Sequence, residues 1–233
     1  MRAWLLFILL LSLVALIWMS GWRPPDRYNP FAPLDLKAEP DVFLRYKLQR
    51  LGADPAMCRA AIHDAGAVFV PLADREEASG CGWHNAVRLT AIGDARLASS
   101  VLVTCPLAAS LVLFDRHVLQ PDAQAAFGSR VRVIEHVGSY FCRNIYHRDQ
   151  APLSRHARAD AIDLTGFRLA NGRQINIAHA WDNGREGAFL HAVHSQGCRY
   201  FGALFGPDYN AAHRTHFHAQ SGSFGYCRQE RGR

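Results

Sequence analysis

The stretch AIDLTGFRLANGRQINIA, residues 161–178, decides the fold. It holds two apolar-rich segments, residues 161–169 and 174–178, on either side of Asn171-Gly172. Asparagine and glycine both tolerate positive φ, so this pair predicts the tight turn of a β-hairpin. We therefore expect two adjacent antiparallel strands at this point of the chain.

Further elements lie on both sides of this hairpin. Residues 131–137 (VRVIEHV) alternate between apolar and polar side chains, which predicts a strand. Residues 107–117 show helical apolar spacing, and the preceding Pro106 suits a first helical turn. The other expected elements are helices at residues 41–51 and 187–201 and strands at 67–71, 87–90, 101–104 and 215–219. No βαβ rhythm is present, so we expect an α+β domain with a central antiparallel sheet flanked by helices.

The composition excludes several protein classes. Of the 233 residues, 49% are hydrophobic and 20% are charged, which indicates a folded domain rather than a disordered chain. The sequence contains neither a heptad run nor a second long apolar segment, which excludes a coiled coil and a polytopic membrane protein. The net charge of +6 would attract anionic polymers such as cell-wall material. Nucleic acid is not an expected partner, because no nucleic-acid-binding signature occurs.

The first residues form an uncharged apolar run, AWLLFILLLSLVALIWMSGW, at 3–22. About 20 such residues match the length of a membrane-spanning helix. We expect residues 1–22 to be a signal anchor that crosses the inner membrane once and leaves the rest of the chain in the periplasm. A cleaved signal peptide is the alternative, although residues 18–21 offer no small-residue cleavage site. Residues 23–40, which contain five prolines, are expected to form a stalk before a single domain at 41–233.

Six cysteines follow the apolar run, and no two of them show C-x-x-C spacing. A cysteine zinc site or a thioredoxin-like site is therefore not expected. The even count predicts three disulfides formed in an oxidising compartment. Proximity in sequence suggests the pairs Cys58–Cys81, Cys105–Cys142 and Cys198–Cys227.

Residues able to bind metal concentrate in two segments, 154–163 and 213–218. If a strand begins at residue 161, its alternation places Asp163 on the face opposite the core. On a strand near residue 217, His216 and His218 share one face. Two adjacent strands would direct these three side chains into one cleft, and His156 would reach it from the preceding loop. Two imidazoles and one carboxylate are a ligand set of catalytic zinc, which keeps a fourth position for water. Zinc lowers the pKa of that water and polarises a scissile carbonyl.

The patterns Ser154-x-His156-x6-Asp163 and His216-x-His218 resemble those of zinc peptidases that cut peptidoglycan peptides. That group, called LAS, includes D-Ala-D-Ala carboxypeptidases and dipeptidases and the murein endopeptidase. A longer set of motifs resembles more narrowly the bacterial extensin-like C-terminal domain family, over residues 40–227. These motifs are GSYFCR at 138–143, SRHARADAID at 154–163, GFRL at 166–169, FGPDYN at 205–210 and HRTHFH at 213–218.

The resemblance implies a fold of the LAS/hedgehog peptidase type and a role for each matching residue. The implied zinc ligands are His156, Asp163 and His218. His216 is implied as the general base, with His213 beside it to position water or stabilise the oxyanion. Arg143 resembles an arginine that grips a substrate carboxylate, and Ser154 matches a substrate-side position.

We therefore expect a membrane-anchored periplasmic zinc peptidase, of the DD- or LD-endopeptidase or carboxypeptidase type, that cleaves peptidoglycan stem peptides or cross-links. Its expected cofactor is Zn²⁺, and its expected partners are peptidoglycan and, through the N-terminal helix, the inner membrane. A regulatory protein partner is left open. The alternative is a non-catalytic module on the same fold that binds cell-wall peptides or a protein, which the absence of a glutamate from residues 213–218 favours. A zinc amidase or esterase acting on another wall polymer is a third hypothesis.

Overall fold

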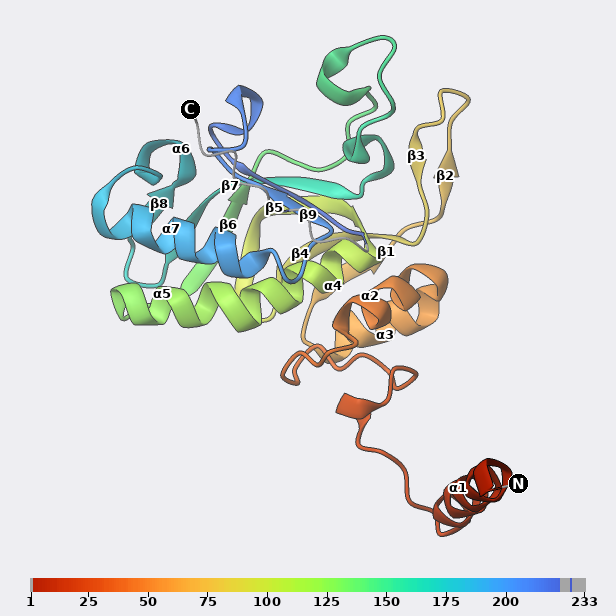
Figure 1. Cartoon of the computed structure of the whole chain (residues 1–233). Coiled ribbons are helices and arrows are strands. Elements are labelled where there is room, and N and C mark those ends of the chain that lie inside the picture. The colour runs from red at the N-terminus through yellow and green to blue at the C-terminus, as the bar shows by residue number, and fades with distance from the viewer. Residues whose placement is uncertain (1, 223–226, 228–233) are drawn as a thin grey trace.

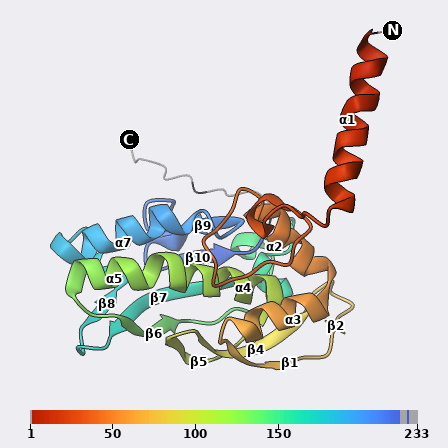
Figure 2. The ribbon, with the colours of Figure 1, turned by 90° about the horizontal axis from the view of Figure 1, so that it is seen from below.

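An eight-stranded sheet forms the centre of the domain, and helices cover one of its faces (Figures 1 and 2). The computed structural model describes residues 2–222 and residue 227. In spatial order the strands are β1 (Val68–Pro71), β4 (Ala86–Ile92), β5 (Ala95–Thr104), β6 (Val131–His136), β7 (Ala161–Leu169), β10 (Phe217–Gln220) and β9 (Ala203–Phe205). β8 (Gln174–Asn176) pairs with β7 outside this order. Only the β5–β6 pair is parallel among these described strands, which confirms the predicted α+β class with a mostly antiparallel sheet.

The predicted hairpin is present as β7 and β8. Its turn is closed by the Leu169 N–H, which donates to the Arg173 carbonyl at 2.9 Å, and Gly172 has a φ of +86°. The second strand is shorter than predicted and ends at Asn176. The Asn176 side chain accepts a hydrogen bond from the His179 N–H and so caps helix α6 (Ile177–Ala180). Capping at this residue explains why the chain leaves the sheet here.

The longest helical segment is built from three consecutive elements. These are α4 (Cys105–Phe114), a π-helical turn η2 (Asp115–Leu119) and α5 (Gln120–Phe127). The helix predicted at 107–117 therefore continues ten residues further, to Phe127, and the following Gly128, with a φ of +62°, ends it. Nearly every side chain of α4 is buried, as expected of a helix that is apolar on all sides.

Three further helices pack beside this segment on the same face of the sheet (Figure 2). They are α2 (Leu44–Ala53), α3 (Pro55–Asp64) and α7 (Gly184–Gly197). Several short elements follow no apolar periodicity and were not predicted. They are strands β2 (Arg75–Glu76), β3 (Gly82–Trp83) and β9, and the 3₁₀ turns η1 (Asp26–Tyr28), η3 (Ile145–His147), η4 (Arg155–Arg158) and η5 (Ala211–His213).

Three disulfides are present, and only one of the predicted pairs is correct. The observed bonds are Cys58–Cys105, Cys81–Cys142 and Cys198–Cys227. Helix α3 packs against α4, which brings Cys58 to the first turn of α4 rather than to the next cysteine in sequence. The predicted pairs Cys58–Cys81 and Cys105–Cys142 are therefore wrong: helix packing joins Cys58 to Cys105, and Cys81, between β2 and β3, bonds to Cys142.

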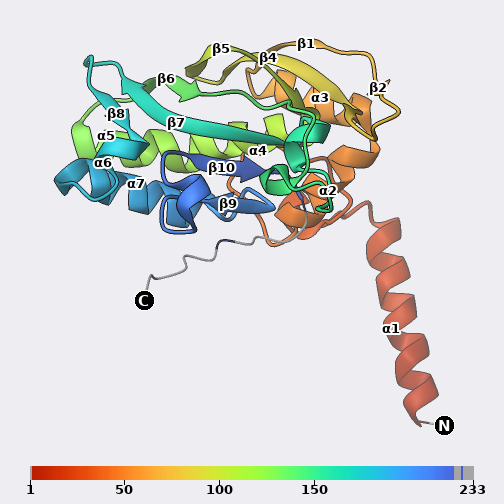
Figure 3. The ribbon, with the colours of Figure 1, turned by 90° about the horizontal axis from the view of Figure 1, so that it is seen from above.

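The predicted single-pass membrane anchor is also wrong. Helix α1 (Arg2–Met19) points away from the domain (Figures 2 and 3), and it stops three residues before the predicted limit at residue 22. Among the residues that the structure describes, no helix has both the length and the apolar character needed to cross a bilayer. This finding contradicts the predicted inner-membrane localisation.

Part of the segment predicted as a stalk packs on the domain. Leu34 and Leu36 belong to the buried core. Helix α2 holds the same segment through Lys47 Nζ, which donates to the Asp26 carbonyl at 2.9 Å, and Arg50 Nη1, which donates to the Phe31 carbonyl at 2.8 Å. Residues before Pro40 thus contribute to the fold, whereas the predicted domain limits stay predictions.

The burial of Asp115 predicts a pH dependence of the protein's stability. Its side chain is buried in η2, and Gln120 Nε2 donates to its Oδ1 at 2.8 Å. Burial raises the pKa of Asp115 from 3.8 to about 7, against the opposing effect of that hydrogen bond. The native protein then binds a proton that the unfolded chain has released between about pH 4 and 7, so the free energy of unfolding falls as the pH rises through this window.

We expect Asp115→Asn to remove this pH dependence and to stabilise the protein by about 2–4 kcal/mol at pH 8, because the amide avoids burial of a charge and its oxygen can still accept from Gln120. Urea unfolding at pH 5 and pH 8 measures the effect. Asp64→Asn, at an exposed carboxylate outside η2, is the control. A variant with the same pH slope as the parent protein would contradict this account.

Candidate metal centre

Two neighbouring strands place Asp163 and His218 opposite each other. β7 and β10 are antiparallel, and their register pairs Asp163 with His218. Ile162 and Leu164 on β7 are fully buried in the core, as are Phe217 and Ala219 on β10. Strand alternation therefore turns Asp163 and His218 together toward the other face of the sheet. His218 Nδ1 lies 2.9 Å from Asp163 Oδ1.

His156 reaches the same point from the short turn η4. The Ser154 side chain caps this turn by accepting from the His156 N–H at 3.3 Å. The His156 ring is buried, and its Nδ1 lies 2.6 Å from the Ser139 carbonyl oxygen. Because a carbonyl can only accept, Nδ1 carries the proton and Nε2 presents its lone pair. Nε2 lies 3.3 Å from Asp163 Oδ1 and 3.1 Å from His218 Nδ1.

The donor set is that of a cation site. His218 Nε2 lies 3.2 Å from Gln220 Oε1, so the tautomer protonated at Nε2 leaves Nδ1 able to bind a cation. Three potential ligand atoms, Asp163 Oδ1, His156 Nε2 and His218 Nδ1, then face one another. His156, Asp163 and His218 each offer one ligand atom, and these atoms all lie within 4.8 Å of one another. Such a convergence of acceptors is unfavourable unless a proton or a metal ion lies among them.

The spacing of the three atoms fits zinc. Zn–N and Zn–O bonds of about 2.0–2.1 Å in tetrahedral geometry separate two ligand atoms by about 3.3 Å. The three separations here are 2.9, 3.1 and 3.3 Å. Each histidine also binds an oxygen through its other ring nitrogen, the arrangement that fixes the orientation of a metal-bound imidazole.

Asp163 is ionised within this cluster. When no metal is bound, burial alone would raise the pKa of its carboxyl group, but hydrogen bonds from imidazole N–H groups of His156 and His218, and the charges of these rings, outweigh burial and hold the pKa well below 3.8. The carboxylate is thus ready to bind a cation over the whole physiological pH range.

Two further histidines lie beside the cluster. His216 precedes β10, and its Nε2 is 3.4 Å from Asp163 Oδ1. His213, at the end of η5, lies 2.8 Å through its Nδ1 from Asn210 Oδ1. Burial lowers the pKa of His213 to about 4, with the charges of His218 and His216 acting in the same direction. Burial also lowers the pKa of His216, so both rings are neutral at pH 7.

The cluster opens into a cavity of about 610 Å³. Seven predicted site residues line it, namely Arg143, Ser154, His156, Asp163, His213, His216 and His218. The remaining lining comes from Arg155, Leu153 and Gln220, from residues 145–147 and from Phe205, Tyr209 and Ala212. The structure thus brings the predicted residues together, while their chemical roles stay predictions. Ser154 has a structural role in addition, because it caps the turn that carries His156.

Three residues of the site were missed from the sequence. Ser139 contributes only a backbone carbonyl, for which no sequence signal exists. Gln220 stands two residues after His218 on the same strand face, so the alternation that linked His216 with His218 could have found it. Asn210 precedes His213 by three residues and caps η5, a spacing typical of a helical N-cap.

A comparison with protein families shows which family the chain is related to. A family model described as "Extensin-like protein C-terminus" matches residues 56–228, well over half of the sequence. The chain belongs to this family. The motifs of this extensin-like domain noted above therefore identify the family correctly. Neither the curated proteins nor the solved structures contain a significant match.

The geometry predicts one zinc ion bound per chain. Asp163→Ala removes one of the three ligand atoms, so we expect zinc affinity to fall by at least about 100-fold. Competition with a chromogenic chelator measures the dissociation constant. The control is His84→Ala, because His84 also contacts two carboxylates, Asp74 and Glu76, but on the exposed surface. Equal zinc affinity in the two variants would contradict the assignment.

Proposed function

We propose that this extensin-like domain is a zinc-dependent hydrolase that cleaves an amide bond in peptidoglycan stem peptides or cross-links. The observation that carries the proposal is the convergence of Asp163 Oδ1, His156 Nε2 and His218 Nδ1 on one point in an open cavity. Two imidazoles and a carboxylate leave a zinc position for water, as a catalytic rather than a structural site requires. The patterns shared with LAS-type peptidases support the same chemistry.

Each residue near the cluster has a place in such a reaction. Zinc held there would activate water and polarise the scissile carbonyl. His216 Nε2 lies 3.4 Å from Asp163 Oδ1. It is therefore close enough to the zinc position to accept the proton of the attacking water and to return it to the leaving amine. His213 is neutral and its Nδ1 donates to Asn210 Oδ1, so its Nε2 carries a lone pair and can accept a hydrogen bond from the attacking water, which would position that water.

The cavity suits a peptide that carries a carboxylate. Arg143 and Arg155 both line it. Arg155 Nη1 is paired with Asp160 Oδ2 at 2.9 Å, which offsets its charge. Arg143 is therefore the better candidate to bind a substrate carboxylate, and stem peptides offer such groups at the terminal D-alanine and on diaminopimelate. A guanidinium can bind a carboxylate through two parallel hydrogen bonds, which fixes its orientation.

A non-catalytic binding module is the second candidate, and one observation favours it. Asp163 is the only acidic side chain among the described residues that line the cavity. A carboxylate base is therefore absent from this lining, and catalysis would depend on histidine. A binding module would retain zinc and wall peptides but would release no product.

Turnover distinguishes the two candidates. The zinc-loaded protein, with its disulfides formed, is incubated with purified sacculi, and soluble products are identified by mass spectrometry. We expect new muropeptides whose masses name the cleaved bond, and we expect them to be absent with Asp163→Ala. Unchanged sacculi with a protein that holds zinc would overturn the hydrolase and favour the binding module.

A second measurement tests the base. We expect His216→Ala to keep its zinc, because the three ligand atoms remain, and to lower kcat by about 10²-fold or more. Steady-state kinetics on the muropeptide found above, together with the zinc content, separate this effect from a loss of metal. His213→Ala serves as the matched variant. A larger loss of kcat in His213→Ala than in His216→Ala would transfer the role of base to His213.

A further inference from the structure

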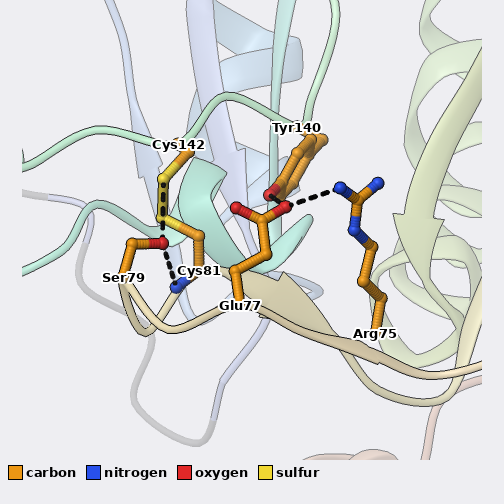
Figure 4. The surroundings of a disulfide bond; sticks show 6 residues. All are labelled: Arg75, Glu77, Ser79, Cys81, Tyr140 and Cys142. Atoms are coloured by element: carbon orange, nitrogen blue, oxygen red, sulfur yellow. Dashed lines mark hydrogen bonds and ion pairs between the residues drawn. A yellow bond between two sulfur atoms is a disulfide. The ribbon is translucent and has the colours of Figure 1, made fainter.

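A small hairpin outside the main sheet holds the segment that supports the metal centre. β2 and β3 form a separate two-stranded sheet, joined to residues 139–143 by the disulfide Cys81–Cys142 (Figure 4). We propose that this hairpin is a positioning element of the site, which fixes the ligand His156 and the cavity residue Arg143 through Cys142 and Tyr140. The inference rests on the proposed function in one respect, the role of His156 as a metal ligand.

The β2–β3 hairpin contacts residues 139–143 through a hydrogen bond and an aromatic pair. Tyr140 Oη donates to Glu77 Oε1 at 3.1 Å, and Arg75 Nη2 lies 3.0 Å from the same carboxylate oxygen (Figure 4). The Tyr140 ring meets the Trp83 ring edge to face, with centroids 5.0 Å apart. Edge-to-face aromatic pairs contribute beyond simple burial. These contacts are made by Tyr140, and the disulfide is formed two residues later, by Cys142.

The disulfide is built into the tip of the hairpin. Cys81 is buried, and its N–H donates to Ser79 Oγ at 3.3 Å. The same hydroxyl lies 3.6 Å from Cys142 Sγ (Figure 4). The loop at 77–81 is closed by the Glu77 N–H, which donates to the Cys81 carbonyl at 2.9 Å. Cys142 is therefore bonded to a closed turn rather than to a free loop.

Each residue held by the hairpin is next to one that supports the site. Ser139, which precedes Tyr140, accepts from His156 Nδ1 at 2.6 Å. The Phe141 N–H donates to the His156 carbonyl at 3.1 Å. Arg143, which follows Cys142, accepts through its carbonyl from the Ser154 N–H at 3.0 Å and lines the cavity. The segment at 139–143 is thus bonded to the hairpin on one side and to η4 on the other.

This segment belongs to none of the described strands. It follows β6, which ends at His136, and it precedes an isolated bridge between Asn144 and Leu153. Without the hairpin, the bonds to η4 would have to order the segment alone. Partners that orient a metal-bound histidine typically change metal affinity by 10–100-fold when they are removed.

Removal of the disulfide tests the inference. In Cys81→Ser/Cys142→Ser, we expect the dissociation constant for zinc to rise about 10-fold. The matched control is Cys198→Ser/Cys227→Ser, which removes a disulfide from the end of α7 and leaves residues 139–143 untouched. Chelator competition gives the zinc affinities. Amide hydrogen exchange of the metal-free proteins gives the order of the Phe141 and Ser154 amides, which we expect to exchange about 10-fold faster only in the first variant.

A milder variant keeps the test valid if the first one does not fold. Tyr140→Phe removes only the hydroxyl that binds Glu77, and Tyr46→Phe is its control. We expect a rise of several-fold in the zinc dissociation constant and faster exchange at Phe141 for Tyr140→Phe alone. Zinc affinity and exchange equal to those of the controls would overturn the positioning role. A parent protein that binds no zinc would instead overturn the proposed function, and the exchange rates would still decide the inference.

Discussion

The antiparallel register of β7 and β10 is the constraint on which the rest of the site depends. It pairs Asp163 with His218, and a slip of one residue would turn either side chain toward the core. The register is secured by burial, because Ile162 and Leu164 on one strand and Phe217 on the other are packed beneath the sheet. The apolar face of this strand pair therefore fixes the candidate metal ligands, Asp163 and His218, on its polar face.

Electrostatic interactions stabilise the ionised Asp163 carboxylate between β7 and β10. A buried carboxylate is costly unless it is paired, and here the imidazoles of His156 and His218 supply the compensation. The outer nitrogens of both rings are bonded to oxygens of Ser139 and Gln220, so the inner nitrogens have no alternative partner. The cluster is consequently pre-organised before any ligand arrives, which lowers the free energy needed to order it on binding.

Local patterns in the sequence predicted how the side chains of this cluster are placed, and distant contacts were predicted poorly. Asn171-Gly172 gave the hairpin, and strand alternation placed Asp163 and His218 on one face, because both signals act within a few residues. The partner of Cys58 depends on how α3 packs on α4, which periodicity does not encode. The short strands β2 and β3 carry too few residues for an alternating pattern, so the support of residues 139–143 could not be seen.

The bridge between Asn144 and Leu153 closes an excursion of the chain. It contains Ile145, Tyr146 and His147, which line the cavity, and it contains none of the three candidate metal ligands. Its two ends already meet, and Asn210 Nδ2 donates to Tyr146 Oη at 2.8 Å, so the excursion is fixed both at its stem and to the residue that caps η5. Substitutions at Ile145 or His147 would therefore change the wall of the cavity and leave the three candidate ligands in place.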